Sequence, residues 1–98
     1  MLEKDLVRKI RLYLDSIDCC FSWKEHGGMY GTAGIPDIIC CIRGRFVALE
    51  VKLPGNQPTP LQEMTMARIR KAGGTADAVY SLDDVKRIIS AAEERDEQ

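Results

Sequence analysis

Two short apolar runs on either side of an Arg-Gly-Arg turn constrain the fold of this chain more than any other feature. Residues 38–42 (Ile-Ile-Cys-Cys-Ile) precede the turn at residues 43–45, and residues 46–51 (Phe-Val-Ala-Leu-Glu-Val) follow it. Runs of this length joined by a short, glycine-containing connection predict an antiparallel β-hairpin. Side chains alternate along a strand, so the second run has two faces. One face carries Phe46, Ala48, Glu50 and Lys52, and the other carries Val47, Leu49 and Val51.

Helical and strand patterns surround the hairpin. Apolar residues recur at helical spacing over residues 2–17, residues 20–24 are typical of a short strand, and residues 27–34 form a glycine-rich connector. Thr59 can cap a helix that has Pro60 at its first position and ends at Gly73-Gly74. Residues 76–81 predict another strand and residues 82–92 a last helix. The predicted order is α-β-β-β-α-β-α, a mixed α/β (α+β) fold.

Length and composition set bounds on the domain organisation. Because the chain has 98 residues, of which 45% are apolar, we expect one domain over residues 1–92. Residues 93–98 (Glu-Glu-Arg-Asp-Glu-Gln) are expected to form an acidic, flexible tail. Uninterrupted apolar stretches are far shorter than the roughly 20 residues of a membrane span, and the first residues lack signal-peptide features. We therefore expect a cytoplasmic protein.

The charge balance leaves room for a basic surface. A net charge of −1 argues mildly against a dedicated nucleic-acid coat protein. Residues 93–98 hold four of the acidic residues and one of the basic ones, so the rest of the chain is slightly basic. Candidate DNA contacts fall into three clusters: Lys4, Arg8 and Arg11; Arg43 and Arg45; and Arg68, Arg70 and Lys71. Each cluster is equally compatible with an ordinary solvated face.

The four cysteines form two adjacent pairs, Cys19-Cys20 and Cys40-Cys41. This spacing is neither that of a zinc site nor that of a disulfide framework. We expect small buried hydrophobic residues in a reducing compartment.

Three polar side chains on the hairpin indicate its chemistry. Asp37 stands at the start of the first run, and Glu50 near the end of the second, so the two carboxylates can face each other. Mg²⁺ and Mn²⁺ prefer such oxygen ligands, and the Val51 carbonyl is a candidate third ligand. A metal of this kind acidifies water and neutralises the charge that develops during phosphodiester hydrolysis. On the same face, Lys52 can orient or help deprotonate the attacking water, or hold the phosphate.

Two further residues have both a functional and a structural interpretation. Glu3 falls in the middle of the apolar face of the first helix, where it would join the carboxylates directly or through water. Alternatively it lies in a frayed first turn that the helix dipole stabilises. Gln62 can position Lys52 or the water, or it can serve only as the reciprocal half of a capping box.

A bare Glu-x-Lys pattern is weak on its own, because it arises by chance in roughly a third of chains of this length. Here it interrupts a strand with a buried pattern, and Asp37 precedes it across the turn, after a proline and a glycine-rich segment. The structural alternative is an edge-strand salt bridge, which would stabilise the fold little.

These residues together resemble the PD-(D/E)xK nuclease superfamily, and specifically the virus-type replication-repair nuclease (VRR-NUC) domain. The matching segments span about residues 3–90 and are Glu3, Gly34-Ile35-Pro36-Asp37, Glu50-Val51-Lys52 and Pro58-Thr59-Pro60-Leu61-Gln62. The resemblance implies a mixed central sheet flanked by helices, Asp37 and Glu50 as metal ligands, and Lys52 as the catalytic lysine. It also implies that Glu3 and Gln62 belong to the site.

Stand-alone members of that family are structure-selective, homodimeric endonucleases of phages and bacteria, similar to Holliday-junction resolvases. The resemblance therefore implies an Mg²⁺- or Mn²⁺-dependent endonuclease on branched DNA, in a bacterial cell or a phage-infected host. Candidate dimer contacts are Phe21, Trp23, Met29 and Tyr30, whereas His26 is expected to be a solvated loop residue. The alternatives are a non-catalytic DNA-binding scaffold and a sequence-specific restriction-type enzyme.

Overall fold

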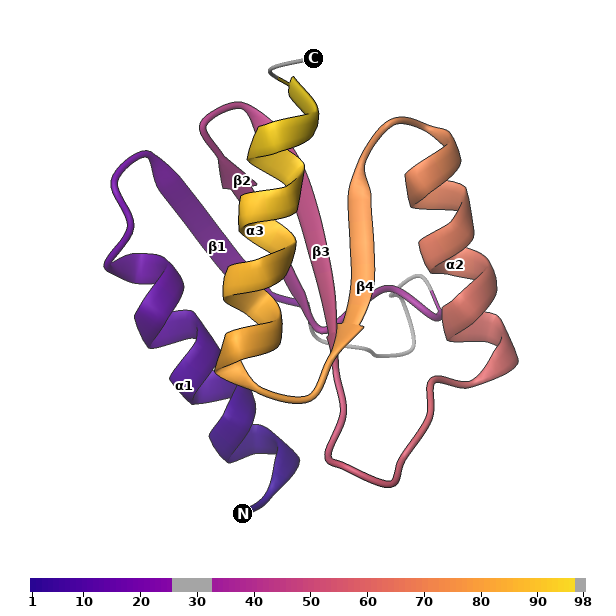
Figure 1. The fold of residues 1–98 in the computed structure, drawn as a ribbon. Helices are drawn as coiled ribbons and strands as arrows, with labels where there is room; N and C mark the ends of the chain where they lie inside the picture. The colour runs from indigo at the N-terminus through magenta and orange to yellow at the C-terminus, as the bar shows by residue number, and fades with distance from the viewer. Residues whose placement is uncertain (26–32, 97–98) are drawn as a thin grey trace.

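The computed structural model describes residues 1–25 and 33–96, and it is built on a four-stranded sheet (Figure 1). The strands are β1 (Cys20–Lys24), β2 (Ile38–Ile42), β3 (Arg45–Val51) and β4 (Thr75–Val79), and they lie in the order β1-β2-β3-β4. β1 and β2 are antiparallel, as are β2 and β3, whereas β4 runs parallel to β3. The mixed sheet and the predicted hairpin are confirmed.

Three helices cover the sheet, and they complete the predicted order α-β-β-β-α-β-α. They are α1 (Glu3–Asp15), α2 (Pro60–Lys71) and α3 (Leu82–Asp96). Figure 1 shows α1 and α3 together on one side of the sheet and α2 beside β4. Because β3 and β4 are parallel, α2 is the crossover that returns the chain to the same end of the sheet.

The two faces of the sheet are packed by different helices. The larger cluster of buried residues joins Val47, Leu49 and Val51 of β3 to the apolar sides of α1 and α3. The smaller cluster joins Ala48 to Met66 of α2 and Ala76 of β4. The alternation of side chains predicted for β3 is thus confirmed, and it places Glu50 on the face that α2 covers.

The start of α2 follows the predicted capping chemistry. The Gln62 backbone N–H donates to Thr59 Oγ1 over 3.2 Å, and the Thr59 backbone N–H donates to Gln62 Oε1 over 2.9 Å. Both halves of the capping box are present, with Pro60 at the first helical position. After the helix, Gly73 has φ +99°, a left-handed conformation that glycine adopts without a steric penalty.

Two predictions about local structure were wrong. The last helix continues through Asp96, so residues 93–96 of the expected tail are helical. Ala, Glu and Arg are good helix formers, and Glu93 accepts a hydrogen bond from Arg43 at the hairpin turn.

The cysteines are all free, but only Cys40 is fully buried, whereas Cys19 and Cys41 are exposed. Cys19 lies in the turn before β1 with φ +61°, and Cys41 lies opposite the exposed Phe21.

Some expectations concern residues outside the described ranges. His26, Met29, Tyr30 and most of the glycine-rich connector are among them. Among the described helices, none has the length and apolar character needed to cross a bilayer.

Candidate functional site

The sheet topology brings the predicted polar residues to one end of the molecule. Ile38 pairs with Leu49, so the residue before β2, Asp37, lies next to Glu50 near the end of β3. α1 and α2 both begin at this same end, at the bottom of Figure 1. Their first turns contain Glu3 and Gln62. Asp37, the end of β3 and the first turn of α1 therefore come together here, and α2 begins at the same end of the sheet.

Asp37 is fixed to the end of β3 by a hydrogen bond. The Val51 backbone N–H donates to Asp37 Oδ2 over 2.8 Å, and the Asp37 side chain is half-buried. The Asp37 backbone carbonyl accepts from the N–H of Glu25 over 2.8 Å, which holds the same residue to the chain after β1. The carboxylate is thus positioned by backbone contacts on both sides.

Glu50 is the most strongly perturbed acid of this cluster, with 2% of its surface exposed. The pKa of Glu50 is raised from 4.5 to about 8, chiefly by burial and then by the hydrogen bond to Asp37 and by the Asp37 charge. The Lys52 charge lowers this pKa, and the Glu3 charge raises it. Asp37, Lys52 and Glu3 are therefore all within electrostatic reach of Glu50, and the Glu50 carboxyl is largely protonated at neutral pH in the metal-free protein.

One oxygen of Glu50 shows whether these residues fit a divalent cation. Glu50 Oε1 is buried and has no hydrogen-bond partner. A buried carboxylate oxygen without a partner is unfavourable, and a hard cation satisfies it while favouring the ionised form. Over residues 1–25 and 33–96, no three acidic, histidine or cysteine residues form a complete metal cage. Asp37 and Glu50 thus fit a partial ligand set, of the kind that leaves positions for water and phosphate.

The remaining predicted residues are near the cluster in different ways. Glu3 interacts with Glu50 electrostatically but does not complete a direct ligand set with the two acids. The Lys52 backbone N–H donates to the Val79 carbonyl over 3.0 Å, which fixes the chain as it leaves β3. Gln62 uses Oε1 in the helix cap. The structural interpretation of Gln62 is therefore confirmed, and its role at the site stays a prediction.

The predicted DNA contacts do not form one surface. Lys4, Arg8 and Arg11 line a hollow beside α1, together with Lys24, which the sequence analysis missed. Arg43 pairs with Glu93, whereas Arg68 and Lys71 are exposed in the last turns of α2. Lys24 was missed because its proximity to α1 depends on tertiary packing and has no signature in the sequence.

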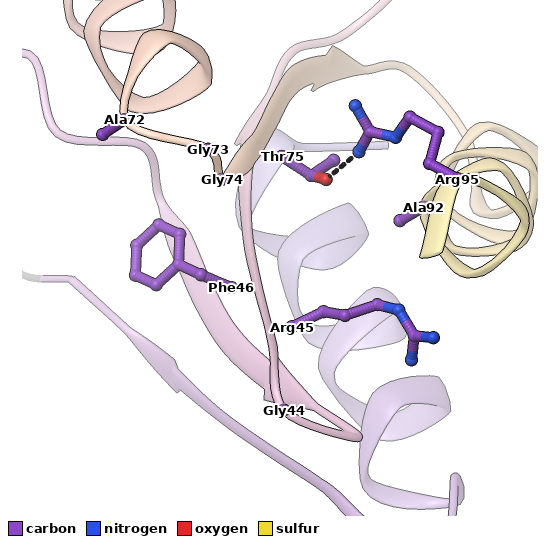
Figure 2. Close-up of a pocket in the computed structure, with 9 residues that line it drawn as sticks. All are labelled: Gly44, Arg45, Phe46, Ala72, Gly73, Gly74, Thr75, Ala92 and Arg95. Atoms are coloured by element: carbon purple, nitrogen blue, oxygen red, sulfur yellow. Dashed lines mark hydrogen bonds between the residues drawn. The ribbon is translucent and has the colours of Figure 1, made fainter. Parts of the chain in front are cut away.

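Arg45 lines a separate cavity at the other end of β3 (Figure 2). This cavity has a volume of about 500 Å³. It lies between the hairpin turn, the α2–β4 connection and the end of α3, where Arg95 donates to Thr75. None of the predicted catalytic residues lines it. Arg45 stands five residues before Glu50, so this end of the strand lies about 16 Å from Glu50.

Comparison with known proteins supports the fold. No family model matches the sequence, and no curated protein matches it. A solved structure named "VRR_NUC domain" aligns with a TM-score of 0.75 over 90% of this chain and 94% of its own, at 24% identity. This chain has the VRR_NUC fold. A second structure, named "VRR_NUC domain protein", aligns with a TM-score of 0.71 over 92% of this chain and 86% of its own, at 21% identity.

The VRR_NUC fold confirms the resemblance that the motifs predicted. The shared architecture is a mixed sheet between helices. At such identities the likeness concerns the fold, and the chemistry depends on the side chains described above.

Proposed function

We propose that this protein is an Mg²⁺- or Mn²⁺-dependent endonuclease that hydrolyses DNA phosphodiester bonds. The observation that carries the proposal is the buried Glu50 Oε1, which has no hydrogen-bond partner and belongs to a carboxylate beside Asp37. A structural ion pair would satisfy this oxygen within the protein, whereas a metal site requires it to be available.

Each residue of the cluster has a role in this mechanism. Asp37 and Glu50 would hold the cation, with the Val51 carbonyl as a candidate third ligand and Glu3 acting through water. The bound cation supplies Lewis-acid activation of water and neutralises charge on the phosphate. Lys52, two residues beyond Glu50, orients the water or stabilises the negative charge that accumulates on the phosphate. Water adds to phosphorus as the bond to the leaving oxygen breaks, and that oxygen takes up a proton.

The proposed substrate is branched DNA, and the proposed active form is a homodimer in the cytoplasm. One cluster per chain cuts one strand, so paired cuts at a symmetric junction require two sites related by a twofold axis. Phe21 and Trp23 on the edge strand β1 are candidate dimer contacts, because their side chains are 70% and 37% exposed. Their ring centroids lie 5.8 Å apart, so they form one aromatic patch.

A panel of labelled substrates tests the proposal. Four-way junction, flap, nicked duplex and linear duplex are incubated with the protein and Mn²⁺, and the products are separated on a denaturing gel. We expect cleavage of the branched substrates by the wild type and none by Glu50→Gln. Discrete bands from linear duplex would indicate a restriction-type enzyme instead.

A non-catalytic DNA-binding scaffold is the alternative, and the incomplete metal cage is the observation that favours it. Calorimetric titration with Mn²⁺ separates the two functions. A scaffold gives the same heat for the wild type and Glu50→Gln, whereas the nuclease gives heat with the wild type alone.

A further inference from the structure

A basic hollow runs along the side of α1 that faces β1. It has a volume of about 350 Å³ and is lined by four cations, one acid and two apolar residues: Lys4, Arg8, Arg11, Lys24, Asp15, Val7 and Leu12. α1 packs against β1, as Figure 1 shows at the left of the molecule. The hollow is therefore open to solvent on its outer side and closed by a helix and a strand.

Among the described residues, the cations of this hollow form no ion pair. Arg11 Nε is buried and has no hydrogen-bond acceptor. A buried guanidinium N–H without an acceptor is unfavourable, so this site favours an anionic ligand that brings its own oxygens.

The spacing of the cations matches a repeating anion. Lys4, Arg8 and Arg11 stand four and three residues apart, so they lie along one side of the helix. At about 1.5 Å per residue, the row is roughly 10 Å long. A row of this length can face more than one phosphate of a nucleic-acid strand, because the strand carries one negative charge per nucleotide. Leu12, which is 62% exposed, offers apolar contact beside the row.

One end of the hollow lies near the carboxylates, with Lys4 on its α1 side and Lys24 on its β1 side. Lys4 follows Glu3, whose charge acts on Glu50. Lys24 precedes Glu25, whose backbone N–H donates to the Asp37 carbonyl. The hollow therefore begins close to the carboxylates, at the same end of the sheet.

We infer that the α1–β1 hollow binds a single phosphodiester strand of the nucleic-acid substrate, with Lys4, Arg8, Arg11 and Lys24 contacting successive phosphates. This inference rests on the proposed nuclease function, because it names the path of the strand that the carboxylates would cut. It assigns the α1 cluster to substrate binding and leaves the cavity at the far end of β3 outside that path.

The salt dependence of binding tests this inference. A fluorescein-labelled oligothymidylate is titrated in EDTA, so that no metal-dependent cleavage occurs, and anisotropy is followed from about 50 to about 200 mM salt. The slope of log K against log salt is negative, and each lost phosphate contact reduces its magnitude by about 0.7 for single strands. For the triple variant Lys4→Gln/Arg8→Gln/Arg11→Gln, the magnitude of the slope should therefore fall by about 2. Its affinity for the oligonucleotide should fall by roughly tenfold or more.

Matched controls separate the hollow from general charge. The triple variant Lys9→Gln/Lys86→Gln/Arg87→Gln removes the same charge from exposed positions outside the hollow and should keep most of the slope. Lys4→Gln and Lys9→Gln are a single-site pair on the same helix, both exposed, and they test the inference even if the triple variant unfolds.

Several results would overturn the inference. One is an equal salt slope for the two triple variants, and another is an equal affinity for the two single variants. A third is no binding of the oligonucleotide by the wild type. The last is displacement of the labelled oligonucleotide by a polyglutamate peptide of the same charge as well as by the unlabelled oligonucleotide. Failure of the nuclease function is distinguishable, because it appears as an absence of cleavage by the wild type with Mn²⁺. Glu50→Gln should keep the wild-type salt slope in EDTA while losing cleavage.

Discussion

Replacing Glu50 with glutamine should stabilise the metal-free protein, and the gain should grow with pH. In the folded state burial raises the pKa of Glu50 from 4.5 to about 8, whereas the unfolded chain ionises near the usual value. Between these pH values the folded state holds a proton that the unfolded state has released. The free energy of unfolding therefore falls by about 1.4 kcal/mol per pH unit through this window.

The size of the effect follows from this slope. The stability that comes from the protonated carboxyl is complete below about pH 4.5 and is lost as the pH rises through about 8. At pH 7 the free energy of unfolding of the wild type is therefore about 3 kcal/mol lower than it would be if residue 50 did not titrate. Glutamine is close in shape, stays neutral and can donate to Asp37, so most of this amount should be recovered. In a chain of this size that is a shift in Tm on the order of 10 °C or more.

Urea denaturation in EDTA at several values between pH 5 and pH 8 measures the effect. Glu94→Gln, at an exposed position on α3, is the matched control and should change little at any pH. A stability difference between Glu50→Gln and the wild type that is the same at pH 5 and pH 8 would refute the reasoning. Adding Mn²⁺ at pH 8 should stabilise the wild type, by about 2.7 kcal/mol at a hundred times Kd, and should not stabilise Glu50→Gln.

Three further substitutions test the local structure and the mechanism. Thr59→Ala removes the cap of α2 and should lower the free energy of unfolding by about 1 kcal/mol, whereas a loss no greater than that of Ser90→Ala on α3 would contradict the cap. Gly34→Ala should destabilise more than Gly55→Ala in thermal melts, because both glycines have positive φ but only at Gly34 would the new Cβ lie 2.7 Å from Thr65 Oγ1. Lys52→Met should abolish cleavage while keeping Mn²⁺ binding, and wild-type cleavage rates in this variant would exclude a role for the lysine.

Much of the site could be predicted because strands and helices have fixed periods. Alternation along residues 46–51 placed Glu50 and Lys52 on one face, and the helical spacing of residues 2–17 turned Glu3 inward. In the structure the charges of both Glu3 and Lys52 influence the pKa of Glu50. The hydrogen bond from the Val51 N–H to Asp37 was not predictable, because it depends on the register between β2 and β3.

The errors have an equally physical origin. The acidic composition of residues 93–98 suggested a solvated tail, but helix propensity and the pairing of Arg43 with Glu93 extend α3. The apolar run of residues 38–42 suggested burial throughout. Cys41 is nevertheless exposed, because it lies in register with Phe21 and Phe46, which are exposed on the same face. Burial on a sheet face depends on which strands a helix covers, and this information is absent from the period of the strand.

The proposed nuclease function depends on Asp37 and Glu50 holding a divalent cation. The most direct measurement is the single-turnover cleavage rate of a labelled four-way junction as a function of Mn²⁺ concentration, for the wild type and for Glu50→Gln. We expect a rate that rises with Mn²⁺ concentration and saturates for the wild type, and no cleavage by the variant at any concentration. Cleavage by the wild type in EDTA, or equal rates for the two proteins, would contradict it.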